Sequence, residues 1–250
     1  MRQPFRTRLK NRETLIGTLV TLPTPEIAEI LAQAGFDWLF VDLEHSPMEP
    51  YQAQAILQAA AGRLDCVLRV PLNDEIWIKK ALDTGAAGVM VPQVNRPEDA
   101  VRAVRYTKYP LLGARSVGLG RAQGYGAGLQ EYLARANDET AVVIQVEHIE
   151  AVNNIEAILG VEGIDAILVG PYDLSASMGL IGNVEHADVQ AAIEKVRQTC
   201  AGRQMPLGIF AGTAERAEVY IKAGYSLVAA SGDTLMLAQS AREVVRRLKG

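Results

Sequence analysis

Short apolar runs alternate with longer amphipathic stretches along the whole chain. The runs are rich in Val, Ile, Leu or Phe without regular polar alternation, which is typical of parallel strands buried on both faces. Eight runs cover residues 15–19, 38–43, 66–70, 88–91, 142–146, 166–169, 207–210 and 227–230. Eight stretches with helical spacing cover residues 25–33, 52–61, 75–84, 97–106, 151–159, 189–201, 214–223 and 234–248. This alternation predicts the α/β class and a (β/α)8 (TIM) barrel.

The domain organisation follows from what interrupts this rhythm. An open doubly wound sheet is the alternative fold, but no glycine-rich dinucleotide-binding loop follows the first run. No linker or shift of composition divides the chain, so we expect residues 1–250 to form a single domain. Residues 108–138 hold six glycines and break the pattern. We expect this segment to be the loop after the fourth strand, on the face where such barrels carry their active sites.

Composition and charge exclude several classes of function. A net charge of -4 does not provide the basic surface that nucleic acids or anionic membranes require. No apolar run reaches the roughly 20 residues of a membrane-spanning helix. Residues 1–10 are polar and basic rather than a secretion signal. Cys66 and Cys200 do not form a CxxC pair, so we expect free thiols in a cytoplasmic protein that binds neither nucleic acid nor membrane.

Polar side chains gather where the predicted strands end. Because the carboxyl ends of barrel strands meet at one rim, these groups are expected to converge there. Charges without partners are costly to bury, so a purely structural barrel has no need of such a set. The polar strand ends are Asp42-Leu43-Glu44-His45, Arg69, Gln93, Gln145-Val146-Glu147 and Gly170-Pro171-Tyr172-Asp173.

Residue types at this rim favour a cation site with an acid/base group beside it. Glu147 and Asp173 end adjacent strands, and two close carboxylates need a cation or a proton between them. Asp42 near His45 would orient the imidazole as a general base. Arg69 can stabilise an oxygen that becomes negative during a reaction. The structural alternatives are an Asp42–Arg69 ion pair, a surface loop position for His45, and helix capping or pairing with Arg or Lys for Glu147 and Asp173.

The strand-end motifs together resemble the HpcH/HpaI aldolase family. Their order and spacing match over nearly the whole chain, and the resemblance is greatest to the 4-hydroxy-2-oxoheptanedioate (hydroxyketoacid) aldolases. It implies a metal-dependent class II aldolase that uses Mg²⁺, Mn²⁺ or Co²⁺ to cleave 4-hydroxy-2-oxo acids, reversibly, to pyruvate or hydroxypyruvate and an aldehyde. The matching segments are residues 35–38, 41–45, 69–71, 91–92, 145–147 and 170–175.

The resemblance also implies a role for each site residue. Glu147 and Asp173 would hold the metal. His45 and Asp42 would be the acid/base pair supported by Glu44, and Arg69 would stabilise the enolate. Tyr172 and Phe210 stand where smaller residues are common, so the acceptor aldehyde is not predicted. The substrate-binding set is Arg69, Gln145, Gly170, Pro171, Tyr172 and Phe210.

Assembly and three alternative functions complete these expectations. The resemblance implies a homohexamer, a trimer of dimers, in which the last helix packs on a neighbouring subunit. The alternatives are a CoA-thioester lyase of the citrate lyase β-subunit type, an oxaloacetate decarboxylase, and a non-catalytic barrel subunit. No lysine is placed for a Schiff base, since Lys79, Lys80 and Lys222 fall on predicted outer helices.

Overall fold

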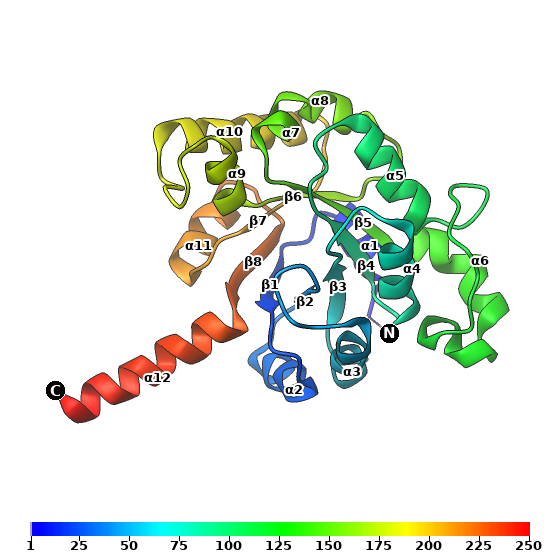
Figure 1. The fold of residues 1–250 in the computed structure, drawn as a ribbon, viewed down its shortest axis with the longest axis horizontal. Coiled ribbons are helices and arrows are strands. Elements are labelled where there is room, and N and C mark those ends of the chain that lie inside the picture. Colours follow the sequence, from blue (N-terminus) through cyan, green and yellow to red (C-terminus); the bar gives the residue numbers. More distant parts are fainter. Residues whose placement is uncertain (1) are drawn as a thin grey trace.

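The computed structural model describes residues 2–250, and its centre is a closed barrel of eight parallel strands (Figure 1). Each strand pairs with the next one in the chain, and β8 closes the barrel against β1. The predicted (β/α)8 barrel is therefore confirmed, with strand limits that differ from the predicted ones by no more than two residues. The strands are β1 (Leu15–Val20), β2 (Trp38–Asp42), β3 (Asp65–Arg69), β4 (Gly88–Val91), β5 (Ala141–Val146), β6 (Ala166–Val169), β7 (Leu207–Phe210) and β8 (Leu227–Gly232).

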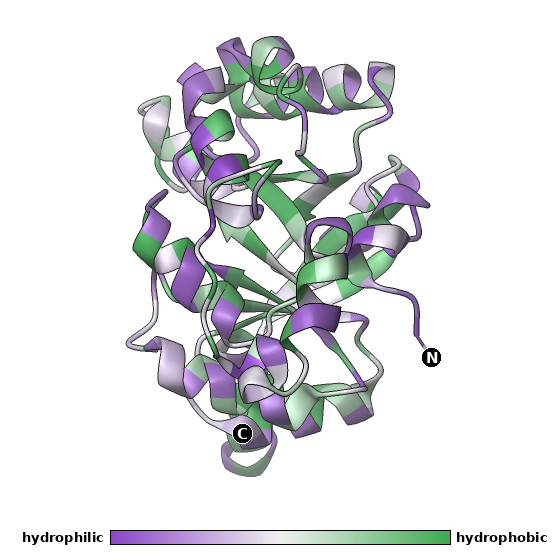
Figure 2. Cartoon of the chain, turned by 90° about the vertical axis from the view of Figure 1, so that its right-hand side faces the viewer, coloured by the Kyte–Doolittle hydropathy of each residue, from purple (hydrophilic) through white to green (hydrophobic). Residues whose placement is uncertain are grey.

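Helices surround the barrel; Figure 2 shows largely hydrophobic strands at the centre and outer helices that mix hydrophobic and hydrophilic residues. The apolar side chains between them form the main buried cluster. The expected helix over 151–159 is two short helices, because Asn154 leaves the helical conformation and donates from Nδ2 to the Asn95 carbonyl at 2.9 Å. The surrounding helices are α2 (Pro25–Ala34), α3 (Pro50–Ala60), α4 (Glu75–Asp83), α5 (Pro97–Thr107), α7 (Ile149–Asn153), α8 (Ile155–Ile158), α9 (Pro171–Ser177), α10 (Ala187–Gly202), α11 (Ala214–Lys222) and α12 (Asp233–Lys249).

The glycine-rich segment 108–138 does not lie on the face we expected. It follows β4 in the chain, but α5 intervenes, so the segment leads back to the amino-terminal end of β5. It contains η1 (Arg121–Gly126) and all but the last residue of α6 (Leu129–Glu139). Arg115 donates to the Asp83 carboxylate at 2.8 Å and Arg121 to the Thr84 carbonyl at 2.7 Å, both where α4 ends. The segment therefore covers the end of the barrel opposite the predicted site.

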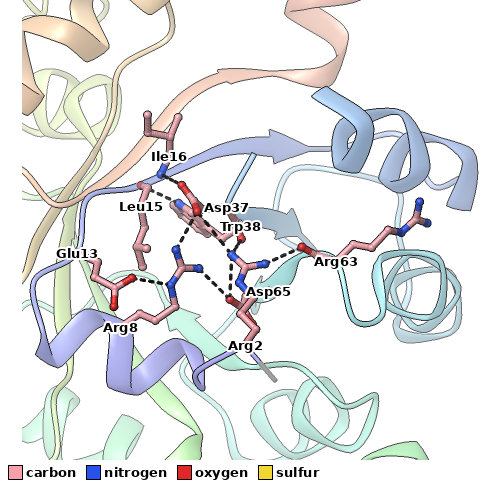
Figure 3. Close-up of polar contacts among 9 residues, drawn as sticks. All are labelled: Arg2, Arg8, Glu13, Leu15, Ile16, Asp37, Trp38, Arg63 and Asp65. Carbon is pink, nitrogen blue, oxygen red and sulfur yellow. Dashed lines mark hydrogen bonds and ion pairs between the residues drawn. The ribbon is translucent and has the colours of Figure 1, made fainter. Parts of the chain in front are cut away.

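A helix that the sequence analysis did not predict, α1 (Phe5–Lys10), closes the amino-terminal end of the barrel. Phe5 and Leu9 are buried in the same interior cluster as Leu15 and Trp38. Around this plug Arg2 and Arg8 converge on Asp37 and Asp65 (Figure 3), and Arg8 bonds the Asp37 carboxylate at 2.8 Å. The side chains of Phe5 and Leu9 thus fill the barrel interior at its amino-terminal end.

Gly17 in β1 provides a test of this packing. A Cβ atom there would lie 2.4–2.6 Å from three atoms of the buried Trp38 ring. We expect Gly17→Ala to lower the free energy of unfolding by about 1–3 kcal/mol, the usual cost of overpacking a core. Denaturant unfolding measures this effect. Gly202→Ala is the matched control, because its Cβ would meet no atom within 4 Å, and equal stability of both variants would contradict the packing argument.

Candidate active site

A cavity of about 160 Å³ opens at the carboxyl-terminal end of the barrel. Eight of the predicted site residues line it, whereas Asp42, Glu44 and Glu147 do not. The sequence analysis missed the apolar part of the wall, formed by Leu19, Phe40 and Leu168. The predicted residues that line the cavity are His45, Arg69, Gln145, Gly170, Pro171, Tyr172, Asp173 and Phe210.

Asp42 and Arg69 form the best-defined ion pair of this rim. They are register partners on β2 and β3, so their side chains emerge on the same face. Arg69 donates from Nε and Nη2 to the two Asp42 oxygens at 2.8 and 2.7 Å, and it lies over the Phe40 ring at 5.0 Å. Burial by itself would lower the pKa of Arg69, but the bonds to Asp42 outweigh it and the pKa is raised. The guanidinium is therefore a fixed positive charge at the cavity wall.

The expected pairing of Asp42 with His45 is wrong. Both Asp42 oxygens accept from Arg69, and Oδ1 also accepts from the Glu44 main-chain N–H at 3.0 Å. Within residues 2–250, the carboxylate nearest His45 is that of Glu44, whose Oε2 lies 3.8 Å from Nε2. The His45 side chain lies on the loop after β2 and is 64% exposed. It lines the cavity without a close hydrogen-bond partner, which leaves it free to turn towards a ligand.

Glu44 is the carboxylate of this group with the most unusual setting. Burial raises its pKa to about 7 from an ordinary 4.5; Arg69 opposes the shift and Glu147 adds to it. Its Oε2 is buried and accepts no hydrogen bond from the part of the chain that the structure describes, although Arg69 Nε lies 3.2 Å away. Near neutral pH this site can therefore take up either a proton or a cation.

A stability measurement in the presence of a chelator tests this shift. The folded protein binds the Glu44 proton more tightly than the unfolded chain does, so the stabilising contribution is complete below pH 4.5 and is lost as the pH rises through 7. Glu44→Gln, which resembles the protonated acid, should match the wild type near pH 4.5 and melt at a higher temperature than it at pH 8. If the difference in melting temperature between Glu44→Gln and the wild type were the same at pH 4.5 and pH 8, the assigned pKa shift would be contradicted.

Glu147 follows β5, and its carboxylate accepts hydrogen bonds from two glutamines, Gln93 and Gln145. Its Oε1 accepts from the main-chain N–H of Gln93 at 2.8 Å and from Gln93 Nε2 at 3.0 Å. Its Oε2 accepts from Gln145 Nε2, and Gln145 Oε1 in turn accepts from Arg69 Nη1 at 3.4 Å. Gln93 is a site residue to which the sequence analysis gave no role, and its position two residues after β4 was the available signal.

The surroundings of Glu147 also fit a cation. Burial raises the pKa of Glu147, the charge of Asp173 raises it further, and the Gln93 N–H opposes both. A Cβ atom at Gly170 would lie 3.3 Å from Glu147 Oε2 and 3.2 Å from Gln145 Nε2. The missing side chain at Gly170 therefore keeps space open beside the carboxylate.

The donor set of the rim suits Mg²⁺ or a similar hard ion. The carboxylates of Asp42, Glu44 and Glu147 lie around the Arg69 guanidinium, and the carboxylate of Asp173 lies near those of Glu44 and Glu147. Residues 2–250 contain no group of three or more His, Cys, Asp or Glu side chains arranged to hold a metal by themselves. Mg²⁺ sites typically combine one or two carboxylates with water and substrate oxygens, so Glu147 and Asp173 fit such an ion. They do not fit a structural zinc site.

An aromatic pair forms the other side of the cavity. The rings of Tyr172, at the start of α9, and Phe210, at the end of β7, lie 6.5 Å apart at an interplanar angle of 56°. The first hydrogen bond within α9 runs from the Leu174 N–H to the Gly170 carbonyl, so the N–H groups of Tyr172 and Asp173 precede it. The cavity thus has one charged wall and one aromatic wall.

Comparison with known proteins gives consistent results along the whole chain. The family model described as HpcH/HpaI aldolase/citrate lyase matches residues 16–240. A hydroxypyruvate/pyruvate aldolase of Paraburkholderia phytofirmans is 36% identical over 98% of this chain and 97% of its own. A 4-hydroxy-2-oxo-heptane-1,7-dioate aldolase of Escherichia coli is 39% identical over 99% and 95%. A crystal structure from Burkholderia cenocepacia, of an HpcH/HpaI aldolase/citrate lyase family protein, aligns with a TM-score of 0.93, 36% identity and 98% coverage of both chains.

Proposed function

We propose, from the premise that this chain belongs to the HpcH/HpaI aldolase/citrate lyase family, that its rim is the active site of a divalent-metal-dependent pyruvate aldolase. The chain is a carbon–carbon lyase, as its named relatives are. The proposed reaction is the reversible cleavage of a 4-hydroxy-2-oxo acid to pyruvate, or hydroxypyruvate, and an aldehyde. The space that Gly170 leaves open beside Glu147 Oε2, in the cavity that Arg69 and Asp173 line, is the observation that carries this proposal.

Glu147 and Asp173 would hold Mg²⁺, Mn²⁺ or Co²⁺. When bound, such an ion supplies Lewis acidity towards the oxygens of a 2-oxo acid. The orphaned buried Oε2 of Glu44 and the mutual repulsion of Glu147 and Asp173 both support a cation at this position. Gln145 links the Glu147 carboxylate to Arg69 and so fixes both charged groups relative to each other.

Arg69 would stabilise the negative charge that develops on the keto oxygen when C3 loses a proton or a carbon–carbon bond breaks. Asp42 occupies Nε and Nη2, which fixes the plane of the guanidinium. Nη1 makes only the longer bond to Gln145 and remains available towards the cavity. A donor that is already in place needs no reorganisation during the reaction, which is the basis of electrostatic catalysis.

His45 would carry the proton between C3 of the oxo acid, or the alkoxide of the aldol, and solvent. It lines the cavity and is open to water, so it can exchange protons at each turnover. Glu44 is its neighbouring carboxylate and takes the supporting role. Asp42 contributes through Arg69 rather than through the imidazole.

The shape of the cavity supports a small oxo acid as the substrate. The main chain of Gly170 and Pro171 and the side chain of Gln145 line the end where the donor would bind. Tyr172 and Phe210 form the side on which the aldehyde would lie. A volume of about 160 Å³ suits a short oxo acid better than a CoA thioester.

Assembly and location belong to the same proposal. Figure 1 shows α12 extending away from the barrel, and it exposes Leu235, Leu237, Val244, Val245 and Leu248. The resemblance implies a homohexamer, and the exposed apolar residues of α12 support this helix as a contact with a second copy. Within residues 2–250, no helix combines the length and the apolar character that a membrane span needs. The free thiols of Cys66 and Cys200 support action in the cytoplasm.

Metal removal tests the proposal directly. Dialysis against a chelator should abolish both aldol cleavage and the exchange of pyruvate C3 protons with deuterium, and Mn²⁺, Mg²⁺ or Co²⁺ should restore both. Borohydride added with pyruvate should trap no covalent adduct, since the cavity lining contains no lysine. Exchange that persists without metal, or a trapped adduct, would refute the proposed mechanism.

A further inference from the structure

The main chain at Gln93 has a conformation that is unusual for a residue other than glycine. Its φ is 54°, in the left-handed region that residues other than Gly, Asn and Asp rarely adopt. Val91 and Val94, on either side of the segment, are completely buried, and Pro92 is buried between them. The main chain is therefore anchored on both sides of Gln93. This packing holds Gln93 in a left-handed conformation that it would not adopt alone.

The direction of its hydrogen bonds separates Gln93 from the other residues with this conformation. Within residues 2–250, the other non-glycine residues with positive φ are Arg12, Tyr125 and Gln204. Each of these donates its main-chain N–H to a carbonyl of its own turn, at 2.8–3.1 Å. The N–H and the side-chain amide of Gln93 instead both reach one oxygen of Glu147, on the neighbouring strand end. The left-handed conformation of Gln93 therefore allows a contact with Glu147 across the site and does not close a local turn.

We infer that Gln93 is a positioning residue that presents Glu147 to the cation, an inference that rests on the proposed function. Its two donors occupy both lone pairs of Oε1. Among residues 2–250, Oε2 accepts only from Gln145, so it keeps a lone pair beside the space that Gly170 leaves open. Gln93 thus determines which Glu147 oxygen remains free. Partners of this kind orient a ligand before the ion arrives, and their loss typically weakens metal binding.

Two variants of this chain both remove the side-chain donor of Gln93, and they differ in whether the left-handed main-chain conformation remains strained. Gln93→Met keeps the length of the side chain and the main-chain N–H but removes the amide donor. Gln93→Gly also removes the amide donor and relieves the left-handed strain. Gln204→Gly is the matched control, since Gln204 is a glutamine with φ 58° that bonds only within its own turn.

The measurement is the Mn²⁺ dissociation constant without substrate, from the electron paramagnetic resonance signal of free Mn²⁺, together with the melting temperature. We expect Gln93→Met and Gln93→Gly to bind Mn²⁺ about tenfold more weakly than the wild type. We expect Gln93→Gly to melt no lower than the wild type, and Gln204→Gly to bind as the wild type does. Raising the Mn²⁺ concentration should restore pyruvate C3 exchange in both Gln93 variants.

The outcomes distinguish this inference from the proposed function. If the wild type binds Mn²⁺ and the dissociation constants of both Gln93 variants are within twofold of its value, the inference is overturned and the proposed function stands. A lower melting temperature with unchanged Mn²⁺ affinity would likewise overturn it, because Gln93 would then be purely structural. A wild type that binds no Mn²⁺ would overturn the proposed function and this inference with it.

Discussion

Replacing Glu147 with glutamine should abolish metal-dependent exchange of the pyruvate C3 protons. The carboxylate is one of two that the proposed site offers to a divalent ion, and the amide removes its charge while keeping its shape. Lewis-acid stabilisation of the reacting oxygen contributes several kcal/mol, so we expect the exchange rate to fall by about 10³-fold or more. Mn²⁺ affinity should fall with it, and both quantities are measured on the same purified protein.

Fold and site effects of this substitution can be separated. The carbonyl oxygen of the introduced amide can still accept from the Gln93 donors that now bond Oε1, so we expect Glu147→Gln to fold. Glu150→Gln is the matched control, because Glu150 lies three residues further along, is partly exposed and pairs with Arg96. If Glu147→Gln kept the exchange rate and Mn²⁺ affinity of Glu150→Gln, Glu147 could not be a metal ligand.

The barrel was predictable from sequence because each strand carries its own local signal. Continuous apolar runs fix the strands, and the rule that strand ends share a rim brought Arg69, Gln145 and Asp173 to one cavity. The segment 108–138 lies at the opposite end of the barrel from the one expected, because α5 reverses the direction of the chain between β4 and this segment. Apolar patterning likewise gave no sign that Phe5 and Leu9 plug the barrel, since α1 is only six residues long.

Pairings within the rim were harder to predict than the rim itself. Asp42 is three residues from His45 in sequence, which favoured that pairing, but its register partner across the sheet is Arg69. Register depends on how neighbouring strands align, which one strand's sequence does not specify. The role of Gln93 depends on a left-handed main chain that no glycine marks. Contacts of this kind are set by the closed barrel and not by local propensity.

The Asp42–Arg69 pair leads to a second large effect. Arg69→Lys should lower kcat for aldol cleavage by about 10²–10³-fold, the usual loss when a donor to a developing oxyanion is removed. A lysine ammonium cannot bond both Asp42 oxygens and also present a fixed donor to the cavity. Mn²⁺ affinity should change little, since Arg69 is not a proposed ligand. Arg96→Lys, at an exposed pair with Glu150, is the control.

A double-mutant cycle then decides which partner Asp42 serves. Because its two oxygens hold Arg69, Asp42→Asn should cost kcat largely through the loss of guanidinium orientation. The effects of Asp42→Asn and Arg69→Lys on the activation free energy should therefore be strongly non-additive. Once either residue of the pair is replaced, replacing the other should cost little more. With His45→Gln the two effects should multiply, because Asp42 makes no ion pair with that imidazole in residues 2–250. The reverse pattern, additive with Arg69 and non-additive with His45, would show that substrate binding rearranges the rim into the acid/base pair that the sequence first indicated.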